Sequence, residues 1–139
     1  MCRSNSMLMS VSYVNPESVH QPTGYTHVVS AEDSRKTLYI AGQVAIDPKG
    51  NMVGAGDLEA QTRQVYENLA LVLKKMGASF SDVVKQNIYT TRMDQLDVIR
   101  KIRSQYLPQN RLPASTVIGV TSLARKEFLI EIEMIAVLK

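Results

Sequence analysis

Residues 128–138 constrain the fold of this chain more than any other segment. Their sequence, FLIEIEMIAVL, is apolar at both alternating sets of positions and is interrupted only by Glu131 and Glu133. A strand with two apolar faces is typical of a sheet that is buried on both sides. We therefore expect a long, largely buried strand here.

A change of hydrophobic period at Asp57 marks the start of a helix. Over residues 58–76, apolar side chains recur at three-, four- and seven-residue spacings, which is typical of an amphipathic helix. Asp57 is the expected N-cap, and Gly77 stands where a left-handed residue ends a helix. The same period predicts a second helix over residues 94–107, capped by Asp94.

Strands are expected on both sides of these helices. Runs rich in β-branched and aromatic residues predict strands over residues 11–15, 25–31, 36–46, 82–91, 114–120 and 128–138. The order strands, helix, strand, helix, strands predicts an α+β fold. In this fold, two helices cover one face of a mixed sheet of about six strands.

The size and charge of the chain limit its organisation. It has 139 residues, of which 45% are hydrophobic, which is enough for one compact domain. We expect this domain over residues 12–139, after a mobile N-terminal extension at residues 1–11. The net charge of +3 comes from scattered residues without a basic stripe, so nucleic-acid binding gains no support.

Residues that bind metals or act as nucleophiles are scarce. The chain has one cysteine, Cys2, and two histidines, His20 and His27, which are too few for a cysteine-based metal site or a zinc centre. A nucleophile elbow is absent from the sequence. No apolar run approaches the roughly 18 residues of a membrane span, and the first residues are too polar for a signal peptide. We expect a soluble, cytoplasmic protein without membrane contact.

Glu131 and Glu133 are the most informative polar residues. Strand alternation directs both to the same face as Leu129, Ile135 and Val137. A carboxylate on an apolar face must reach solvent, find a partner or hold its proton. The pattern leaves two interpretations open: a solvated strand face, or a general acid or water-orienting base.

Four stretches of the chain together resemble a known family. They are YIAGQVAIDPKG, AQTRQVYENLALVLKKMGASFSDVVKQNIYTT, LPAST and IEIEMIAV. In order and spacing they resemble the Rid proteins, the reactive intermediate deaminases, also called the YjgF or L-PSP family. The resemblance implies a chorismate-mutase-like fold, assembled as a homotrimer with small-molecule clefts at the subunit interfaces. Family members with deaminase activity hydrolyse enamines and imines to 2-keto acids and ammonia, without a metal or a cofactor.

The resemblance also assigns expected roles to individual residues. Tyr25 matches the cleft tyrosine of the family, and Glu131 matches the glutamate that positions the attacking water. Gly42 matches the glycine of the GQ strand, and Tyr89 falls where an aromatic residue lines the cleft. Deaminating members carry an arginine for the substrate carboxylate at the position of Ser115, so the resemblance implies a subgroup that lacks this arginine.

Further departures bear on what the cleft can bind. Ala41 replaces a frequent serine, and Val117 replaces a frequent cysteine, which makes the expected cleft less polar. A serine cannot replace a fork of charged donors, so ordinary 2-imino acid deamination is in doubt. Ser115 and Thr116 either hydrogen-bond a differently shaped ligand or only cap the strand end.

Two arginines are candidates for a replacement cation. Arg100 lies on the second expected helix near a family cleft position, and Arg111 lies four residues before Ser115. The alternative for each is a solvated surface residue.

Three functional hypotheses follow. The first is a homotrimer that hydrolyses a small imine, enamine or related metabolite, with Glu131 as the catalytic residue. The second is a non-catalytic protein that binds a metabolite in the same cleft. The third and least supported is an endoribonuclease or translation inhibitor.

Overall fold

The computed structural model describes residues 8–139. Its strands are β1 (Ser10–Val14), β2 (Val28–Glu32), β3 (Lys36–Gln43), β4 (Val83–Thr90), β5 (Ala114–Gly119) and β6 (Ile130–Leu138). Its helices are α1 (Leu58–Lys75) and α2 (Leu96–Tyr106), with short 3-10 turns at η1 (Phe80–Asp82) and η2 (Met93–Gln95). Of the expected N-terminal extension, residues 1–7 lie outside the described part, and Ser10 and Val11 already belong to β1.

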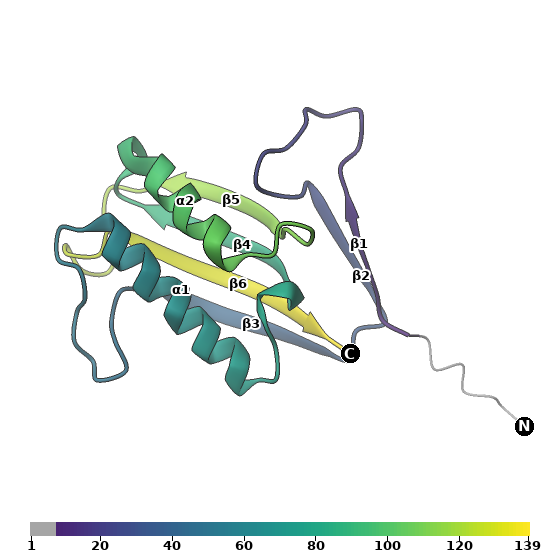
Figure 1. Ribbon diagram of the computed structural model, residues 1–139, viewed down its shortest axis with the longest axis horizontal. Helices are drawn as coiled ribbons and strands as arrows, with labels where there is room; N and C mark the ends of the chain where they lie inside the picture. The colour runs from purple at the N-terminus through teal and green to yellow at the C-terminus, as the bar shows by residue number, and fades with distance from the viewer. Residues whose placement is uncertain (1–7) are drawn as a thin grey trace, which may run out of the picture.

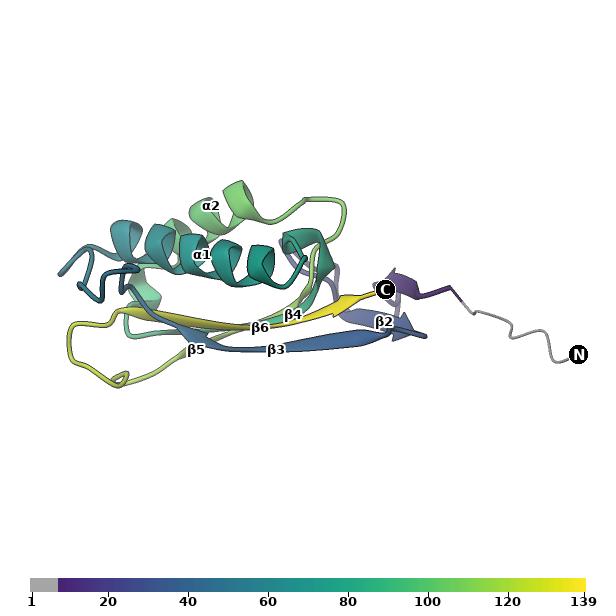
Figure 2. The ribbon, with the colours of Figure 1, turned by 90° about the horizontal axis from the view of Figure 1, so that it is seen from below.

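Four of the strands form one mixed sheet in the order β3-β6-β4-β5. β6 is antiparallel to both β3 and β4, whereas β4 and β5 are parallel. Both helices lie on one side of this sheet, as Figure 2 shows. β1 and β2 form a separate two-stranded antiparallel ladder beside it (Figure 1). The predicted α+β fold with six strands and two helices on one face is confirmed, with the strands divided into four and two.

The predicted signals hold at both ends of α1 but not at the start of α2. The carboxylate of Asp57 accepts a hydrogen bond from the Ala60 N–H at 3.1 Å, which caps α1. Gly77, with φ of +74°, follows the C-terminal end of α1 in the left-handed conformation that glycine adopts most easily. The predicted cap at Asp94 is wrong, because this residue lies inside the 3-10 turn η2 and α2 begins at Leu96.

The second predicted strand begins later than expected. Tyr25, Thr26 and His27 lie outside the ladder, and the backbone N–H groups of Thr26 and His27 bond to other partners. The Thr26 N–H donates to the Pro113 carbonyl at 3.1 Å, and the His27 N–H donates to the Asn15 side chain at 2.8 Å. The connection between β1 and β2 is therefore held against the segment that leads into β5.

The hydrophobic core lies between the helices and the four-stranded sheet. Its fully or almost fully buried members include Val65, Leu69, Leu73, Ile88, Ile99, Ile102, Ile130, Ile132, Met134 and Ala136. In β6 the even-numbered residues face this core, so Glu131 and Glu133 face the other side of the sheet. We call the sheet surface opposite α1 and α2 the open face.

Gln61 fixes the entry to β6 from inside the core. Its side chain is fully buried and donates to the Gly54 and Glu127 carbonyls at 3.0 and 2.8 Å. It also accepts a hydrogen bond from the Leu129 N–H at 2.8 Å. One α1 side chain thus satisfies three backbone groups, two of which lie immediately before β6.

Gln61→Leu should lower the free energy of unfolding strongly. The substitution keeps the volume but leaves buried backbone groups unpaired, at about 1–3 kcal/mol for each. Chemical denaturation measures the effect. Gln64→Leu is the matched control, because Gln64 bonds only to the Asn68 side chain one turn away. Equal stability losses for the two variants would contradict this role of Gln61.

Candidate functional site

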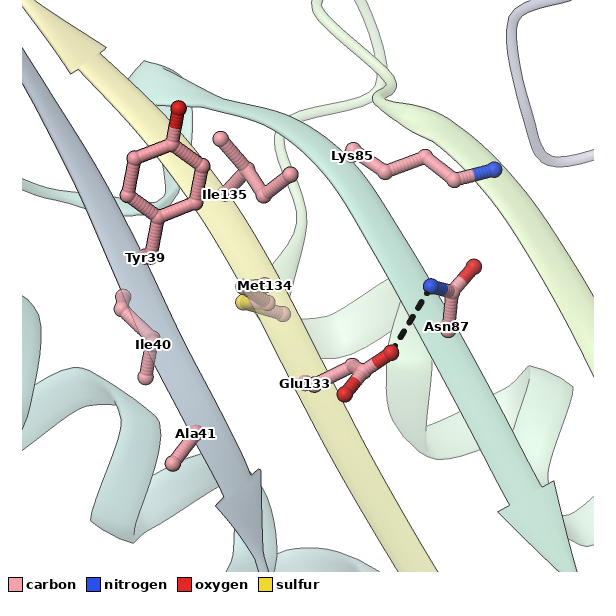
Figure 3. Close-up of a pocket in the computed structure, with 8 residues that line it drawn as sticks. All are labelled: Tyr39, Ile40, Ala41, Lys85, Asn87, Glu133, Met134 and Ile135. Atoms are coloured by element: carbon pink, nitrogen blue, oxygen red, sulfur yellow. Dashed lines mark hydrogen bonds between the residues drawn. The ribbon is translucent and has the colours of Figure 1, made fainter.

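The open face carries a pocket of about 460 Å³ over β3, β6 and β4 (Figure 3). It is lined by Tyr39, Ile40, Ala41, Lys85, Asn87, Glu133, Met134 and Ile135. The four polar members, Tyr39, Lys85, Asn87 and Glu133, come from three different strands. The sheet itself therefore forms the floor of a site lined by both polar and apolar side chains.

Glu133 is the hydrogen-bonded carboxylate of this pocket. Its Oε1 accepts from the Asn87 side-chain amide and from the Tyr89 hydroxyl, each at 2.9 Å. Figure 3 shows the contact between Glu133 and Asn87, which face each other across the ladder of β4 and β6. The two hydrogen bonds, that of Asn87 first, lower the pKa of Glu133 below its usual value. The hydrogen bond to Glu133 also raises the pKa of Tyr89. Glu133 is therefore an ionised carboxylate with two fixed partners.

Glu131 has a different environment. It lies opposite Tyr89 in the ladder of β4 and β6 and is partly buried. Within residues 8–139, no hydrogen bond or ion pair ends on its carboxylate. The carboxylate can therefore hold a water molecule or a ligand atom.

Gly42 makes room for the Glu131 side chain. A Cβ atom at position 42 would lie 2.7 Å from the Glu131 carboxyl carbon and closer still to an oxygen. The β3 ladder is irregular at the same place, between Ile40 and Gln43. Gly42 therefore lies at an irregularity of the ladder, and its lack of a side chain leaves room for the Glu131 carboxylate.

Strand β5 directs its predicted site residues to opposite sides of the sheet. Ser115 pairs with Gln86 and Val117 with Ile88, so both share the helix side with these core residues. Thr116 faces the open side and accepts a hydrogen bond from the Lys85 amine at 3.3 Å. Of the three predicted site residues on β5, Thr116 alone shares a face with Glu131 within one chain.

Tyr25 lies on the connection between β1 and β2. Its hydroxyl is hydrogen-bonded to His20 Nε2 at 2.8 Å, and its ring meets the His27 ring edge-on at 5.3 Å. These contacts hold Tyr25 within its own connection. Within residues 8–139, no hydrogen bond or aromatic contact connects Tyr25 with Glu131.

The two candidate arginines are placed as follows. Arg100 is exposed on α2. Arg111 donates from Nε to the Tyr13 hydroxyl at 3.2 Å, and its guanidinium lies over the Tyr13 ring. Arg111 is therefore held by its contacts with Tyr13 of β1.

Sequence reasoning missed Asn87, Lys85 and the hydrogen-bonded role of Glu133. A signal was available, because Lys85, Asn87 and Tyr89 alternate with the buried residues Gln86 and Ile88 along β4. Alternation identifies the face of these residues but not their partners, which depend on the register between β4 and β6.

The described residues offer no candidate for metal binding by clustered ligands or for a helix that spans a membrane. Residues 8–139 contain no group of three or more histidine, cysteine, aspartate or glutamate side chains that could hold a metal ion. None of the helices in this part of the chain has the length and apolar character needed to span a membrane.

Comparison with known proteins identifies the family. A family model described as Endoribonuclease L-PSP matches residues 17–138, which is nearly the whole chain. The chain belongs to this family. A solved structure of a conserved Rid family protein from Yersinia pestis supports the same conclusion, with a TM-score of 0.83 and 39% identity. That similarity covers 92% of this chain and 98% of the Yersinia chain.

Curated relatives in the Rid family carry two kinds of name. A RutC family protein of Pyrococcus horikoshii is 36% identical over 121 residues, which are 86% of this chain and 92% of the relative. A 2-iminobutanoate/2-iminopropanoate deaminase of Mus musculus is 34% identical over 102 residues, 73% of this chain and 74% of the relative. The predicted family is thus confirmed, and some of its members are named as deaminases.

Tyr89→Phe should raise the pKa of Glu133 toward its ordinary value of 4.5, because one of two donors is lost. In the wild type the folded-state pKa is lowered, so ionised Glu133 stabilises the fold above about pH 4.5. This stabilisation disappears as the pH falls through the folded-state pKa, and the variant should lose less of it. A carboxyl NMR titration measures the pKa, and Tyr39→Phe is the control on the same face. An unchanged Glu133 pKa in Tyr89→Phe would contradict the assignment.

Proposed function

We propose that this Rid family protein is a cytoplasmic homotrimer that hydrolyses a small imine, enamine or related metabolite at clefts between its subunits. The deaminase names of several relatives support this reaction class. Its selectivity differs from that of members with an arginine at the position of Ser115. The reaction needs no metal or cofactor.

The observation that carries the proposal is the free carboxylate of Glu131. Glu133 is held by two donors, whereas Glu131 lies against Gly42 without a protein partner in the described chain. A carboxylate in this situation can orient water and accept its proton. Glu131 is therefore the proposed catalytic residue.

The proposed reaction proceeds by addition of water and loss of ammonia. Water that is hydrogen-bonded to Glu131 attacks the imine carbon, a C–O bond forms, and Glu131 takes the proton. That proton passes to the nitrogen, which gives a carbinolamine. Glu131 then transfers the proton of the new hydroxyl to the nitrogen, a C=O bond forms as the C–N bond breaks, and the carbonyl compound and ammonia leave. An enamine enters the same sequence after proton transfer to carbon gives the imine.

The trimer is supported by the surface of the open face. No helix within residues 8–139 covers this face, and Tyr39 on β3 and Ile118 on β5 are 80% and 40% exposed. Neighbouring copies would bury these side chains. They would also bring a second set of residues, including Tyr25, Thr116 and Tyr89, to the substrate.

A matched pair of variants tests the catalytic assignment. Imines are generated in the assay by an amino-acid oxidase, and the release of ammonia and carbonyl product is followed. Glu131→Gln should lower turnover by about 10²- to 10⁴-fold, as expected for loss of a general base. Glu133→Gln is the control on the same strand face and should retain most of the activity.

The outcomes distinguish the residues. Full activity of Glu131→Gln on every imine that the wild type hydrolyses would refute the mechanism. A larger loss of turnover in Glu133→Gln than in Glu131→Gln would indicate that the reaction takes place in the pocket of Figure 3.

A second candidate function is metabolite binding without turnover. It is favoured by Ser115, which places no charged group on β5 and lies on the side of the sheet away from Glu131. A metabolite that raises the melting temperature but is recovered intact would support this function. The description of the family model also refers to a ribonuclease. A net charge of +3 spread along the chain gives little support to RNA binding and cleavage.

A further inference from the structure

The pocket of Figure 3 holds a negative charge that the proposed hydrolysis does not use. Glu133 accepts both of its hydrogen bonds, from Asn87 and Tyr89, on Oε1. Within residues 8–139, its second oxygen, Oε2, accepts no hydrogen bond, and no ion pair ends on this carboxylate. Figure 3 shows the second oxygen turned away from Asn87. Half of the carboxylate is therefore free to bind a donor from outside the chain.

The partners of Glu133 favour its charge but do not neutralise it. Asn87 donates from a neutral amide, and this hydrogen bond is the main cause that lowers the pKa of Glu133. Tyr89 also stays neutral, because its hydrogen bond to Glu133 raises the pKa of the hydroxyl above the ordinary value of 10.0. Two neutral donors thus hold a full negative charge in place. The partner that such a carboxylate lacks is a cation.

Lys85 is the basic residue that lines the same pocket, and it does not pair with Glu133. Its amine donates to the Thr116 hydroxyl at 3.3 Å, and Figure 3 shows it directed away from the carboxylate. In the ladder of β4 and β6, Lys85 stands opposite Ile135, one diagonal position away from Glu133. The cation of the pocket therefore lies on its β5 side and leaves the charge of Glu133 unpaired.

The side of the pocket toward β3 is mainly apolar. Tyr39 and Ile135 line it and stand opposite each other in the ladder of β3 and β6, and Ala41 lies two residues further along β3. Tyr39 is 80% exposed, and an aromatic ring attracts both cations and apolar groups. The volume of about 460 Å³ is that of a small-molecule site. The pocket therefore suits a ligand with a cationic head and a short apolar body.

The single free oxygen of Glu133 narrows the kind of cation. A guanidinium presents a planar fork of donors that matches both oxygens of a carboxylate, and one of these is already occupied twice. Calcium and magnesium ions require several oxygen ligands, and the described residues contain no cluster of three or more acidic, histidine or cysteine side chains that could supply them. An ammonium group needs one acceptor at a time, so it fits this carboxylate best.

We propose that this pocket binds a small primary amine in its protonated form. The ammonium group donates to Oε2 of Glu133, and an apolar body of a few carbon atoms packs against Tyr39 and Ile135. A primary alkyl amine resembles the lysine side chain, with a pKa of about 10.4, so it carries the required charge at neutral pH. The site uses residues other than Glu131, and its existence does not depend on the proposed hydrolysis.

The test compares probes that share one carbon chain and differ in charge: n-butylammonium, n-butanol and butyrate. Each is titrated against the wild type at constant ionic strength, and the melting temperature is followed. We expect a saturable rise with n-butylammonium and no saturable rise with the other two. The neutral alcohol controls for purely apolar binding, and the anion controls for general ionic effects.

Variants connect the response with the carboxylate. Glu133→Gln removes the charge at similar size and should weaken n-butylammonium binding by about 10- to 100-fold, as expected for the loss of a charged hydrogen bond. Glu127→Gln makes the same change of charge at an exposed position before β6 and should leave the midpoint unchanged. Lys85→Met removes the neighbouring positive charge and should tighten binding by up to about fivefold. If Glu133→Gln does not fold, the sign of the Lys85→Met effect decides, because an anion site would lose affinity.

Three results would overturn the proposal. The first is the absence of a saturable response to n-butylammonium, which is also the result if a neighbouring copy fills the pocket in the assembled protein. The second is an equal response to n-butanol, or an equal midpoint in the wild type and in Glu133→Gln. The third is a larger loss of binding in Glu131→Gln than in Glu133→Gln, which would place the amine at the proposed catalytic residue. Imine hydrolysis that persists without an amine response would count against this proposal alone.

Discussion

The pairing of β6 on both of its edges is the constraint on which the rest of the structure depends. β3 and β4 fix its backbone, and alternation then directs Ile130, Ile132 and Met134 into the core beneath the helices. The same alternation places Glu131 and Glu133 on the open face. A shift of one residue would bury both carboxylates and expose the apolar set. The hydrophobic core thus sets the position of the charged groups.

The two glutamates of β6 differ because their neighbours across the ladders differ. Glu133 lies opposite Asn87, and donors from Asn87 and Tyr89 favour its ionised form. Glu131 lies beside Gly42, which has no side chain that could donate to it. One strand therefore presents two carboxylates two residues apart, of which Glu133 is hydrogen-bonded within the chain and Glu131 is free to bind water or a ligand.

The sequence predicted the features that depend on local period. Asp57 and Gly77 marked the ends of α1, and the alternation around Glu131 predicted the face of β6. Sequence reasoning failed at Asp94, because a 3-10 turn replaced the expected cap.

Features that depend on register between distant strands were not predictable in the same way. The helix-side position of Ser115 follows from its pairing with Gln86 in a parallel ladder, which no local pattern specifies. Arg103 had a visible signal, since it follows Ile99 and Ile102 at helical spacing on the inner face of α2. Its charge made a surface position the natural expectation, and only the packed structure shows its burial.

The contact between Gly42 and Glu131 is the central claim, and a double-mutant cycle of unfolding free energies tests it most directly. Gly42→Ala, Glu131→Ala and the double variant are compared with the wild type at one protein concentration. If Gly42 is needed to make room for the Glu131 carboxylate, Gly42→Ala should lower the free energy of unfolding of the wild type. The same substitution should lower it much less when residue 131 is alanine. The expected coupling is on the order of 1–2 kcal/mol. A cost of Gly42→Ala that is the same in both backgrounds would contradict the account.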